Sequence, residues 1–328
     1  IYIAKGICNP PPDLDSLLLK DENVAVRIIG SKAYTDLVEY ILSPLGNDSA
    51  DNLDDRAREK LQIRRNTLIC TAQSHAVIHV ASSLPLDVVN DYHEDNSETS
   101  AYAKAPLKSN AESAFKSVSS AITFTRENTF SKNYDLIYEQ YYITNSESKI
   151  ITRPTIPFIS EEGPISEISM EELRFAKKFA SILHHEKEIS KIIEVYSDSL
   201  TPYKSSHLHA FIAAWTALEI FVTKQFKDLQ PTISININGI PAHKDFSTQM
   251  LSIMSDKYRL TGKFAVISNI FDSNNSDKDI DQFKKIKLIR DEFFHSMKGE
   301  AKDLPLDLTR QLFSKYFKIY LINKYSIN

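Results

Sequence analysis

The strongest constraint on the fold is a change of hydrophobic period near residue 168, after which apolar residues recur at helical spacing almost to the end of the chain. Ser169 precedes an acidic first turn, and Leu173, Ala176 and Leu183 begin an apolar face that continues to Ile193. A cap residue followed by this spacing is typical of an amphipathic helix, because about 3.6 residues make one turn. We therefore expect one long helix from residue 169 to about residue 195.

Three later stretches repeat this apolar spacing: residues 206–229, 277–297 and 306–322. Gly299 and Pro305 separate the last two, and a glycine after one helix and a proline at the start of the next are typical helix boundaries. Short helical pieces are expected around residues 246–271. The second half therefore predicts an all-α helical bundle with four main helices over residues 161–328.

The first half of the chain mixes strand and helix patterns. Runs rich in β-branched and aromatic residues predict strands at residues 24–29, 62–71, 76–80, 121–125 and 135–143. Helical spacing predicts helices at residues 31–42 and 49–62, whereas residues 96–120 fit either a surface loop or a weak helix. This mixture is typical of an α+β domain.

A connector is expected between the two halves. Pro154, Pro157 and Pro164 interrupt any regular period before Ser169, as in a linker. A chain of 328 residues also exceeds the usual size of one domain, about 100–200 residues. The expected fold class is α+β, with a mixed N-terminal domain over residues 1–160 and a helical domain over residues 161–328.

Composition excludes several classes of protein. No apolar run approaches the roughly 18 residues of a membrane span, and the opening residues show no secretion signal. The two cysteines, Cys8 and Cys70, are too few for a disulfide framework, so a cytoplasmic location is expected. A net charge of -4 argues against coating nucleic acid by bulk charge, although a local basic patch could still bind phosphates. Glycine-rich nucleotide-binding loops are absent from the sequence.

Arg290 stands near the centre of an apolar helical stripe. At about 100° per residue, Phe283, Ile286 and Phe294 lie within roughly 40° of Arg290 on an ideal helix. A buried guanidinium needs a carboxylate, an anion or a wet seam, since leaving it unpaired is costly. One interpretation is structural: Glu219, on the Trp215 side of the second helix, would pair with Arg290 and hold two helices together.

His295 follows Arg290 by five residues, which is about 140° around an ideal helix. The two side chains therefore share a face only if the helix loosens or ends near them. Gly299 makes a frayed end plausible, and a second protomer across a symmetry axis would be another way to bring an Arg and a His into one groove.

The string "RDEFFH", residues 290–295, is similar to the R-x4-6-H motif of the HEPN superfamily (higher eukaryotes and prokaryotes nucleotide-binding). The stretch "FIAAWTALEIF", residues 211–221, resembles the helix that precedes the motif helix in the Apea-like HEPN group. One more amphipathic helix then closes the chain, as in that group. The resemblance covers about residues 168–325 and does not extend to the first half.

The resemblance implies a metal-independent endoribonuclease that needs no cofactor. His295 would act as a general acid or base, because imidazole titrates near physiological pH. Arg290 would stabilise the negative charge of the phosphorane transition state with its planar fork. Asp291 would orient one of these two groups or remain solvated, and both interpretations stay open. Attack by the ribose 2′-OH would restrict the substrate to RNA, transfer RNA among the candidates.

The resemblance also implies a homodimer through the C-terminal helical domain, in which two motifs line one cleft. Lys284, Lys285 and Lys287 lie on the motif helix and would contact RNA phosphates, although Lys284 and Lys285 are equally what a solvated face carries. No metal is expected, since "HHEKE" at residues 184–188 lacks the spacing that places two imidazoles on one helical face.

Three interpretations of function follow. The first is a HEPN ribonuclease of prokaryotic antiphage defence or toxin type, with the N-terminal half sensing a trigger or guiding substrate choice. The second is a catalytically inactive HEPN module that binds RNA or nucleotide or serves as a scaffold. The third is a regulatory partner of another enzyme. None of them involves a membrane.

Overall fold

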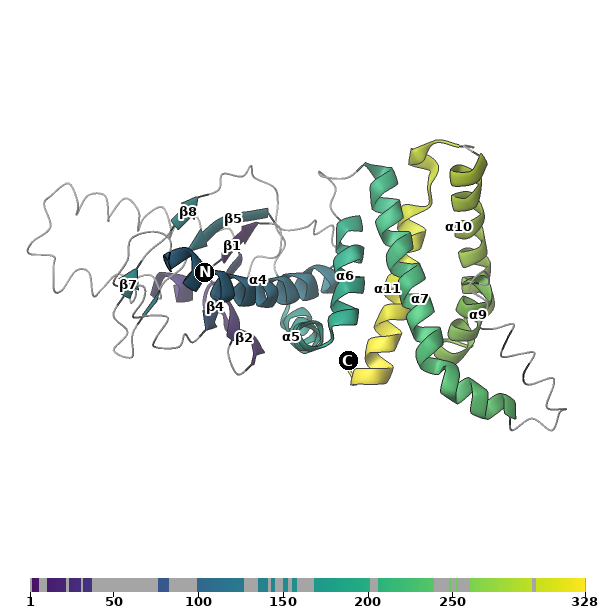
Figure 1. Cartoon of the computed structure of the whole chain (residues 1–328), viewed down its shortest axis with the longest axis horizontal. Coiled ribbons are helices and arrows are strands. Elements are labelled where there is room, and N and C mark those ends of the chain that lie inside the picture. The colour runs from purple at the N-terminus through teal and green to yellow at the C-terminus, as the bar shows by residue number, and fades with distance from the viewer. Residues whose placement is uncertain are drawn as a thin grey trace, which may run out of the picture. The chain divides into compact units, whose positions relative to one another are not determined.

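The computed structural model describes much of the chain (Figure 1). It describes residues 2–5, 11–21, 24–30, 32–36, 76–82, 99–126, 135–140, 143–144, 150–152, 155–157, 168–200, 206–238, 248, 252, 260–296 and 299–327. The chain forms two compact units, Ile1–Ser190 and Lys191–Asn328. The predicted domain boundary near residue 160 lies outside the described residues.

The first unit contains an antiparallel six-stranded sheet in the order β2-β3-β4-β1-β5-β8, and a separate pair formed by β6 and β7. The strands are β1 (Tyr2–Lys5), β2 (Asp15–Lys20), β3 (Val24–Ile29), β4 (Ala76–Ser82), β5 (Asp135–Gln140), β6 (Ile143–Thr144), β7 (Ile150–Thr152) and β8 (Thr155–Pro157). Three predicted strands, at residues 24–29, 76–80 and 135–143, correspond to β3, β4 and β5 with β6. The predicted strand at residues 62–71 and helix at residues 49–62 lie outside the described residues.

Strands β2 and β3 show how this sheet faces a core. Val26 and Ile28 are fully buried, whereas Arg27 between them points outward and pairs with Asp15 at 2.8 Å. This alternation is the period of a half-buried strand. The chain after β3 turns at Gly30, where a Cβ atom would lie 2.0 Å from the carbonyl oxygen of Pro11, so glycine permits this close approach.

Helix α4 (Thr99–Thr125) packs against α5 and the sheet. Within the stretch of residues 96–120, which fitted either a loop or a weak helix, the described residues from Thr99 onward are helical. The predicted strand at residues 121–125 is wrong, because these residues form the last turns of α4. Ala121, Ile122 and Phe124 are fully buried there. A short apolar run with β-branched residues fits a buried helix as well as a strand.

The expected single helix from residue 169 is two helices, α5 (Met170–His185) and α6 (Lys187–Ser199). Ser169 caps the start of α5, as predicted, and it forms a capping box with Glu172. The helix ends at Glu186, which leaves helical geometry with φ −100° and ψ 84°. The apolar face of α5 packs on α4 and β2, whereas Tyr196 of α6 stacks on Phe313 in the second unit. The break at Glu186 allows α5 to pack in the core of the first unit and α6 to pack in the core of the second.

After α6, the described part of the second unit contains α7 (His207–Asn238), α9 (Leu260–Phe271), α10 (Ser276–Ser296) and α11 (Leu306–Tyr325). A short 3-10 turn, η3 (Ala301–Asp303), lies between α10 and α11. Helix α7 packs on α9 and α11, and α10 packs on α9 and α11 (Figure 1). The predicted helices at residues 206–229, 277–297 and 306–322 are confirmed, and α7 is longer than expected.

Aromatic rings fill the centre of this unit. Phe264 of α9 stacks on Phe283 of α10 with ring centroids 4.4 Å apart and meets Tyr316 of α11 edge-on. Phe221 of α7 packs against Phe317 of α11 at 5.5 Å. Large buried rings contribute much of the hydrophobic stabilisation of a core. These contacts fix α10, and with it the residues of the motif, against the other helices.

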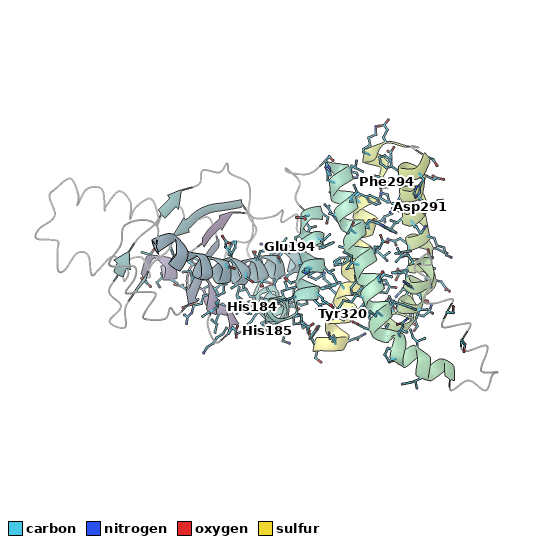
Figure 2. All side chains as sticks on the ribbon, in the orientation of Figure 1. His184, His185, Glu194, Asp291, Phe294 and Tyr320 are labelled. Atoms are coloured by element: carbon cyan, nitrogen blue, oxygen red, sulfur yellow. The ribbon has the colours of Figure 1, made fainter. Side chains whose placement is uncertain are left out.

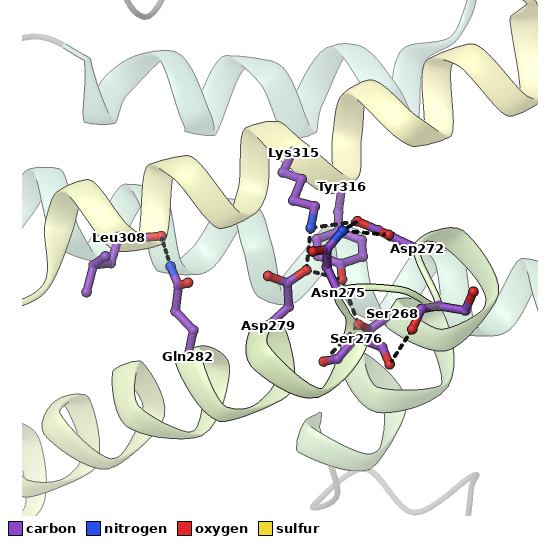
Figure 3. Close-up of polar contacts among 10 residues, drawn as sticks. Ser268, Asp272, Asn275, Ser276, Asp279, Gln282, Leu308, Lys315 and Tyr316 are labelled. Atoms are coloured by element: carbon purple, nitrogen blue, oxygen red, sulfur yellow. Dashed lines mark hydrogen bonds and ion pairs between the residues drawn. The ribbon is translucent and has the colours of Figure 1, made fainter.

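A polar cluster joins α9, α10 and α11 (Figure 3). Asp279 at the start of α10 is 5% exposed, accepts a hydrogen bond from the Tyr316 hydroxyl at 2.7 Å, and pairs with Lys315. Lys315 also pairs with Asp272 at 2.7 Å, and the Tyr316 hydroxyl lies 2.6 Å from Ser268 Oγ. Burial and the Asp279 carboxylate raise the pKa of Tyr316. The cluster therefore anchors the N-terminal end of α10.

The architecture confirms the α+β class: an antiparallel sheet with helices, followed by a helical unit. Among the described helices, none is both long enough and apolar enough to cross a membrane.

Candidate functional site

Arg290 lies on α10, and its guanidinium contacts two aromatic rings. Its guanidinium carbon is 5.8 Å from the ring centroid of Trp215 on α7 and 5.8 Å from that of Phe294, one turn further along α10. The Arg290 side chain is 32% exposed, whereas Trp215 is 5% exposed. A cation over aromatic faces is stabilised by about 0.5–1 kcal/mol at a partly exposed site. The charge is therefore accommodated in the apolar stripe while its edge still reaches solvent.

Glu219 supports this arrangement from α7. The Trp215 indole N–H donates to Glu219 Oε2 at 3.1 Å, one helical turn along α7. This hydrogen bond fixes the plane of the indole ring that lies under Arg290. Within the described part of the chain, Arg290 makes no ion pair with Glu219, so the direct Arg–Glu link between two helices is replaced by one that passes through the Trp215 ring.

Asp291 holds two cations of the same helix. It accepts a hydrogen bond from Arg290 Nη1 at 2.7 Å and another from Lys287 Nζ at 2.5 Å. Partial burial alone would raise the pKa of Asp291, but these two hydrogen bonds outweigh it and hold the pKa below its usual value. Asp291 is thus a carboxylate that orients Arg290, which is one of the two roles left open by the sequence.

His295 lies in the last turn of α10 and is exposed. The helix runs without a break to Ser296, so it does not loosen between Arg290 and His295. Five residues of helix separate the two side chains by about 140° around the axis. Gly299 adopts a positive φ of 88° only after α10 has ended. In a single chain, therefore, the imidazole and the guanidinium point in different directions.

His295 shares its side of α10 with a row of other residues: Lys284, Leu288 and Asp291, spaced by four, three and four positions. Lys284 is exposed and pairs with Asp281 at 3.0 Å, and Leu288 is 59% exposed. Lys285 is exposed as well. Of the three predicted phosphate-binding lysines, Lys287 alone lies in the Arg290–Asp291 cluster. For Lys284 and Lys285 both alternatives remain: they contact RNA phosphates, or they belong to a solvated face of the helix.

Phe294 is a site residue that the sequence interpretation used only as part of the apolar stripe. Its ring is 37% exposed, and the ring centroid lies 5.8 Å from the guanidinium carbon of Arg290. The spacing of four residues between Arg290 and Phe294 is the signal that could have found it, because side chains at this spacing meet on a helix.

Two other histidines, His207 and His185, make hydrogen bonds within the helical framework. His207 Nε2 lies 2.9 Å from the carbonyl oxygen of Leu304, and His185 Nδ1 lies 2.8 Å from that of Ser181. Over the described ranges, no group of three or more His, Cys, Asp or Glu side chains is placed to hold a metal ion.

No protein-family model, no curated protein and no solved structure matches the chain. The similarity to HEPN proteins therefore depends on the motif and the tryptophan-containing helix alone, and it stays a prediction.

Proposed function

We propose that the chain is a metal-independent endoribonuclease of the HEPN type. The observation that supports this best is the placement of Arg290: its partly exposed guanidinium lies near the rings of Trp215 and Phe294 and donates a hydrogen bond to Asp291. A cation fixed in this way is suited to an anion that approaches from solvent, such as a phosphodiester. An exposed imidazole, that of His295, lies five residues away on the same helix.

The proposed reaction needs only these groups and the RNA. The ribose 2′-oxygen attacks the adjacent phosphorus, the bond to the 5′-oxygen breaks, and a 2′,3′-cyclic phosphate and a 5′-hydroxyl end result. His295 takes the proton from the 2′-OH or gives one to the leaving 5′-oxygen. Arg290 donates hydrogen bonds to the non-bridging oxygens as their negative charge grows. Lys287 adds positive charge beside Arg290, and Lys284 and Lys285 contact neighbouring phosphates.

A homodimer is part of the proposal. Since Arg290 and His295 diverge on one helix, two copies of α10 that face each other would supply the imidazole of one chain to the guanidinium of the other. Exposed apolar side chains on α7 and α10 support a contact of this kind: Ile212, Ile220, Leu288 and Phe294. Such side chains would be covered in the proposed dimer.

The biological role that we propose is prokaryotic antiphage defence or toxicity, carried out in the cytoplasm. The first unit, with its sheet and helices α4 and α5, would sense a trigger, restrain the nuclease or guide substrate choice. This role follows from the resemblance to HEPN proteins.

Cleavage of purified RNA tests the proposal. The full chain is incubated with total RNA or transfer RNA in the presence of EDTA, and the products are examined for 2′,3′-cyclic phosphate ends. We expect cleavage of RNA but not of DNA of the same sequence, because DNA lacks the attacking hydroxyl. His295→Ala and Arg290→Ala should each abolish cleavage and leave the thermal melt nearly unchanged. If Arg290→Ala unfolds the second unit and His295→Ala leaves activity intact, the nuclease proposal is wrong.

A second function is favoured by one specific observation. Because α10 is an unbroken helix, Arg290 and His295 point in different directions in a single chain. A module that binds RNA or nucleotide without cleaving it, or a scaffold, does not need the two side chains to meet. This alternative predicts RNA binding that depends on Arg290 and Lys287, without cleavage at any protein concentration. A regulatory partner protein would then be expected to co-purify with the chain.

A further inference from the structure

A groove lies in the second unit, on residues that the proposed nuclease does not use. It has a volume of about 520 Å³, and residues of α7 and α11 and the end of α9 line it. Volumes of roughly 300–1,000 Å³ are typical of sites for small molecules. Figure 2 labels Tyr320, which lines this groove, and Asp291 and Phe294 of the motif, which lie toward the other end of the helical unit.

Gln225 is a buried residue that lines the groove. It is 3% exposed, and its side-chain Nε2 is buried without a hydrogen-bond partner among the described residues. A buried N–H group without an acceptor is rare in proteins, because its lost hydration is not replaced. The terminal torsion of a glutamine side chain is broad, so the amide can adjust toward a molecule in the groove. An acceptor atom on a ligand would therefore complete the hydrogen bonding of this amide.

The charged residues of the groove do not require a charged ligand. Lys224 pairs with Asp228 at 3.1 Å. Lys324 donates to the Tyr320 hydroxyl at 3.1 Å, and its ammonium lies 4.9 Å from the ring centroid of Tyr325. An anion would lose much of its own hydration in the groove, and ammonium groups that already have partners replace little of that hydration. The groove therefore favours an uncharged ligand.

Apolar side chains form another part of the groove. Phe271 at the end of α9 and Leu229 on α7 line it, and both are partly exposed. A ligand that contacts them would remove apolar surface from water, which is favourable. An aromatic ring supplies such contact at a low cost in conformational entropy, because the ring is flat and rigid.

We propose that this groove binds a small uncharged aromatic molecule that carries a carbonyl oxygen. The ring would contact Phe271 and Leu229, and the carbonyl oxygen would accept a hydrogen bond from the Gln225 amide. None of the residues that line the groove belongs to the motif helix α10, so the site does not depend on the proposed function.

Titration of the full chain without RNA, followed by NMR of the ligand, tests the proposal. The probe is acetophenone, an aromatic ring with an uncharged carbonyl group. Benzoate has the same ring with a carboxylate. We expect acetophenone to bind in a 1:1 ratio and benzoate to bind at least about tenfold more weakly, because the groove does not replace the hydration of its charge. Benzoate that binds as tightly as acetophenone would show that the proposed class of ligand is wrong.

Gln225→Leu tests the hydrogen bond. Ethylbenzene is the matched ligand, since it has the shape of acetophenone without the acceptor. The substitution should weaken acetophenone binding about tenfold and leave the affinity for ethylbenzene unchanged or higher, because ethylbenzene makes no hydrogen bond. Gln225→Leu should also melt at or above the wild-type temperature, because it removes a donor that has no partner among the described residues.

Two further variants locate the site. Leu229→Trp should abolish binding of both acetophenone and ethylbenzene, because the larger side chain fills the groove. Lys227→Met, at an exposed position of the same helix that does not line the groove, should bind as the wild type does. Failure of acetophenone to bind the wild type, or binding that Gln225→Leu leaves unchanged, would overturn the proposal. If Gln225→Leu does not fold, unchanged binding by Leu229→Trp would overturn it instead.

Discussion

The guanidinium of Arg290 has three neighbours, and they respond differently to substitution. The rings of Trp215 and Phe294 lie over it, and Asp291 accepts its hydrogen bond. A lysine at position 290 would keep the positive charge but lose the planar fork and the stacking surface. The contacts of Arg290 within the folded chain are partly exposed, so each contributes little to the free energy of unfolding. A hydrogen bond from Arg290 to the transition state would lower the activation free energy of cleavage by more than that.

Arg290→Lys is therefore expected to lower the rate of RNA cleavage by about 100-fold while it lowers the free energy of unfolding by no more than about 1 kcal/mol. Single-turnover cleavage and urea unfolding of the same preparation measure the two quantities. A variant that unfolds more easily but cleaves RNA at the wild-type rate would show that Arg290 is a structural residue.

Asp291→Asn tests the carboxylate that holds Arg290 and Lys287. The folded-state pKa of Asp291 lies below the ordinary value of 3.8, so the unfolded chain takes up a proton first as the pH falls. The stabilisation by Asp291 is thus complete above pH 3.8 and is lost as the pH falls through the lower, folded-state pKa. Near pH 7 we expect Asp291→Asn to lower the free energy of unfolding by about 0.5–1 kcal/mol.

Urea unfolding at about pH 7 and about pH 3 measures this difference, which should shrink at the lower pH. Asp281→Asn is the matched control, because Asp281 pairs with Lys284 on the exposed side of the same helix. A gap between wild type and Asp291→Asn that stays constant with pH would contradict the assignment.

The sequence predicted the unusual residue but not all of its surroundings. Helical periodicity alone identified Arg290 as a charge in an apolar stripe, and the proximity of Trp215 followed from the expected packing of two helices. The choice of Asp291 over Glu219 as ion-pair partner could not be predicted, because it depends on side-chain rotamers and on the angle between α7 and α10.

At the scale of elements, α10 is the helix on which the proposed chemistry depends, and the polar cluster holds its N-terminal end. Asp279 accepts hydrogen bonds from Lys315 and Tyr316 inside a largely buried site (Figure 3). Removal of one partner from such a cluster leaves the other groups without hydrogen bonds. The cluster should therefore contribute much more to stability than the ion pairs on the surface of the helix.

Asp279→Ala is expected to lower the free energy of unfolding of the second unit by about 2–4 kcal/mol. Asp277→Ala provides the matched control, since Asp277 also lies in the first turn of α10, where it meets the same helix dipole, but is exposed. It should cost no more than about 1 kcal/mol. Equal effects of the two substitutions in chemical denaturation would mean that the cluster adds nothing beyond the dipole.

Helix boundaries were predicted well where the sequence contains a capping or helix-breaking residue, as at Ser169, Gly299 and Pro305. They were predicted poorly where tertiary packing determines whether a segment is helical or where a helix ends. The break at Glu186 follows from the division of the apolar residues between two cores, and the helical state of residues 121–125 follows from burial against α5. Neither cause is visible in the local sequence.

At the scale of the whole molecule, the proposed site is complete only if two copies of the chain act together. Leu288 on α10 and Ile220 on α7 are exposed, as expected of side chains that a second copy covers. We expect light scattering after gel filtration to give a mass of twice 37.3 kDa, and Leu288→Glu to reduce it to that of one chain with loss of cleavage.

Ile322→Glu is the control for the dimer, because Ile322 is similarly exposed on α11, away from the motif. It should leave both mass and cleavage unchanged. A wild-type chain that cleaves RNA as a monomer at every concentration would contradict the shared site.

Because the polar cluster anchors the N-terminal end of α10, a small tilt at that end moves the C-terminal end of the helix by a larger distance. Asp279 and His295 are sixteen positions apart in the sequence, which is about 24 Å along a helix axis, so a tilt of about 5° at the clamped end displaces the imidazole by about 2 Å. A shift of that size is enough to misalign a proton transfer. A change that loosens the polar cluster around Asp279 is therefore expected to lower the rate of the proposed cleavage, although the cluster does not contact the RNA.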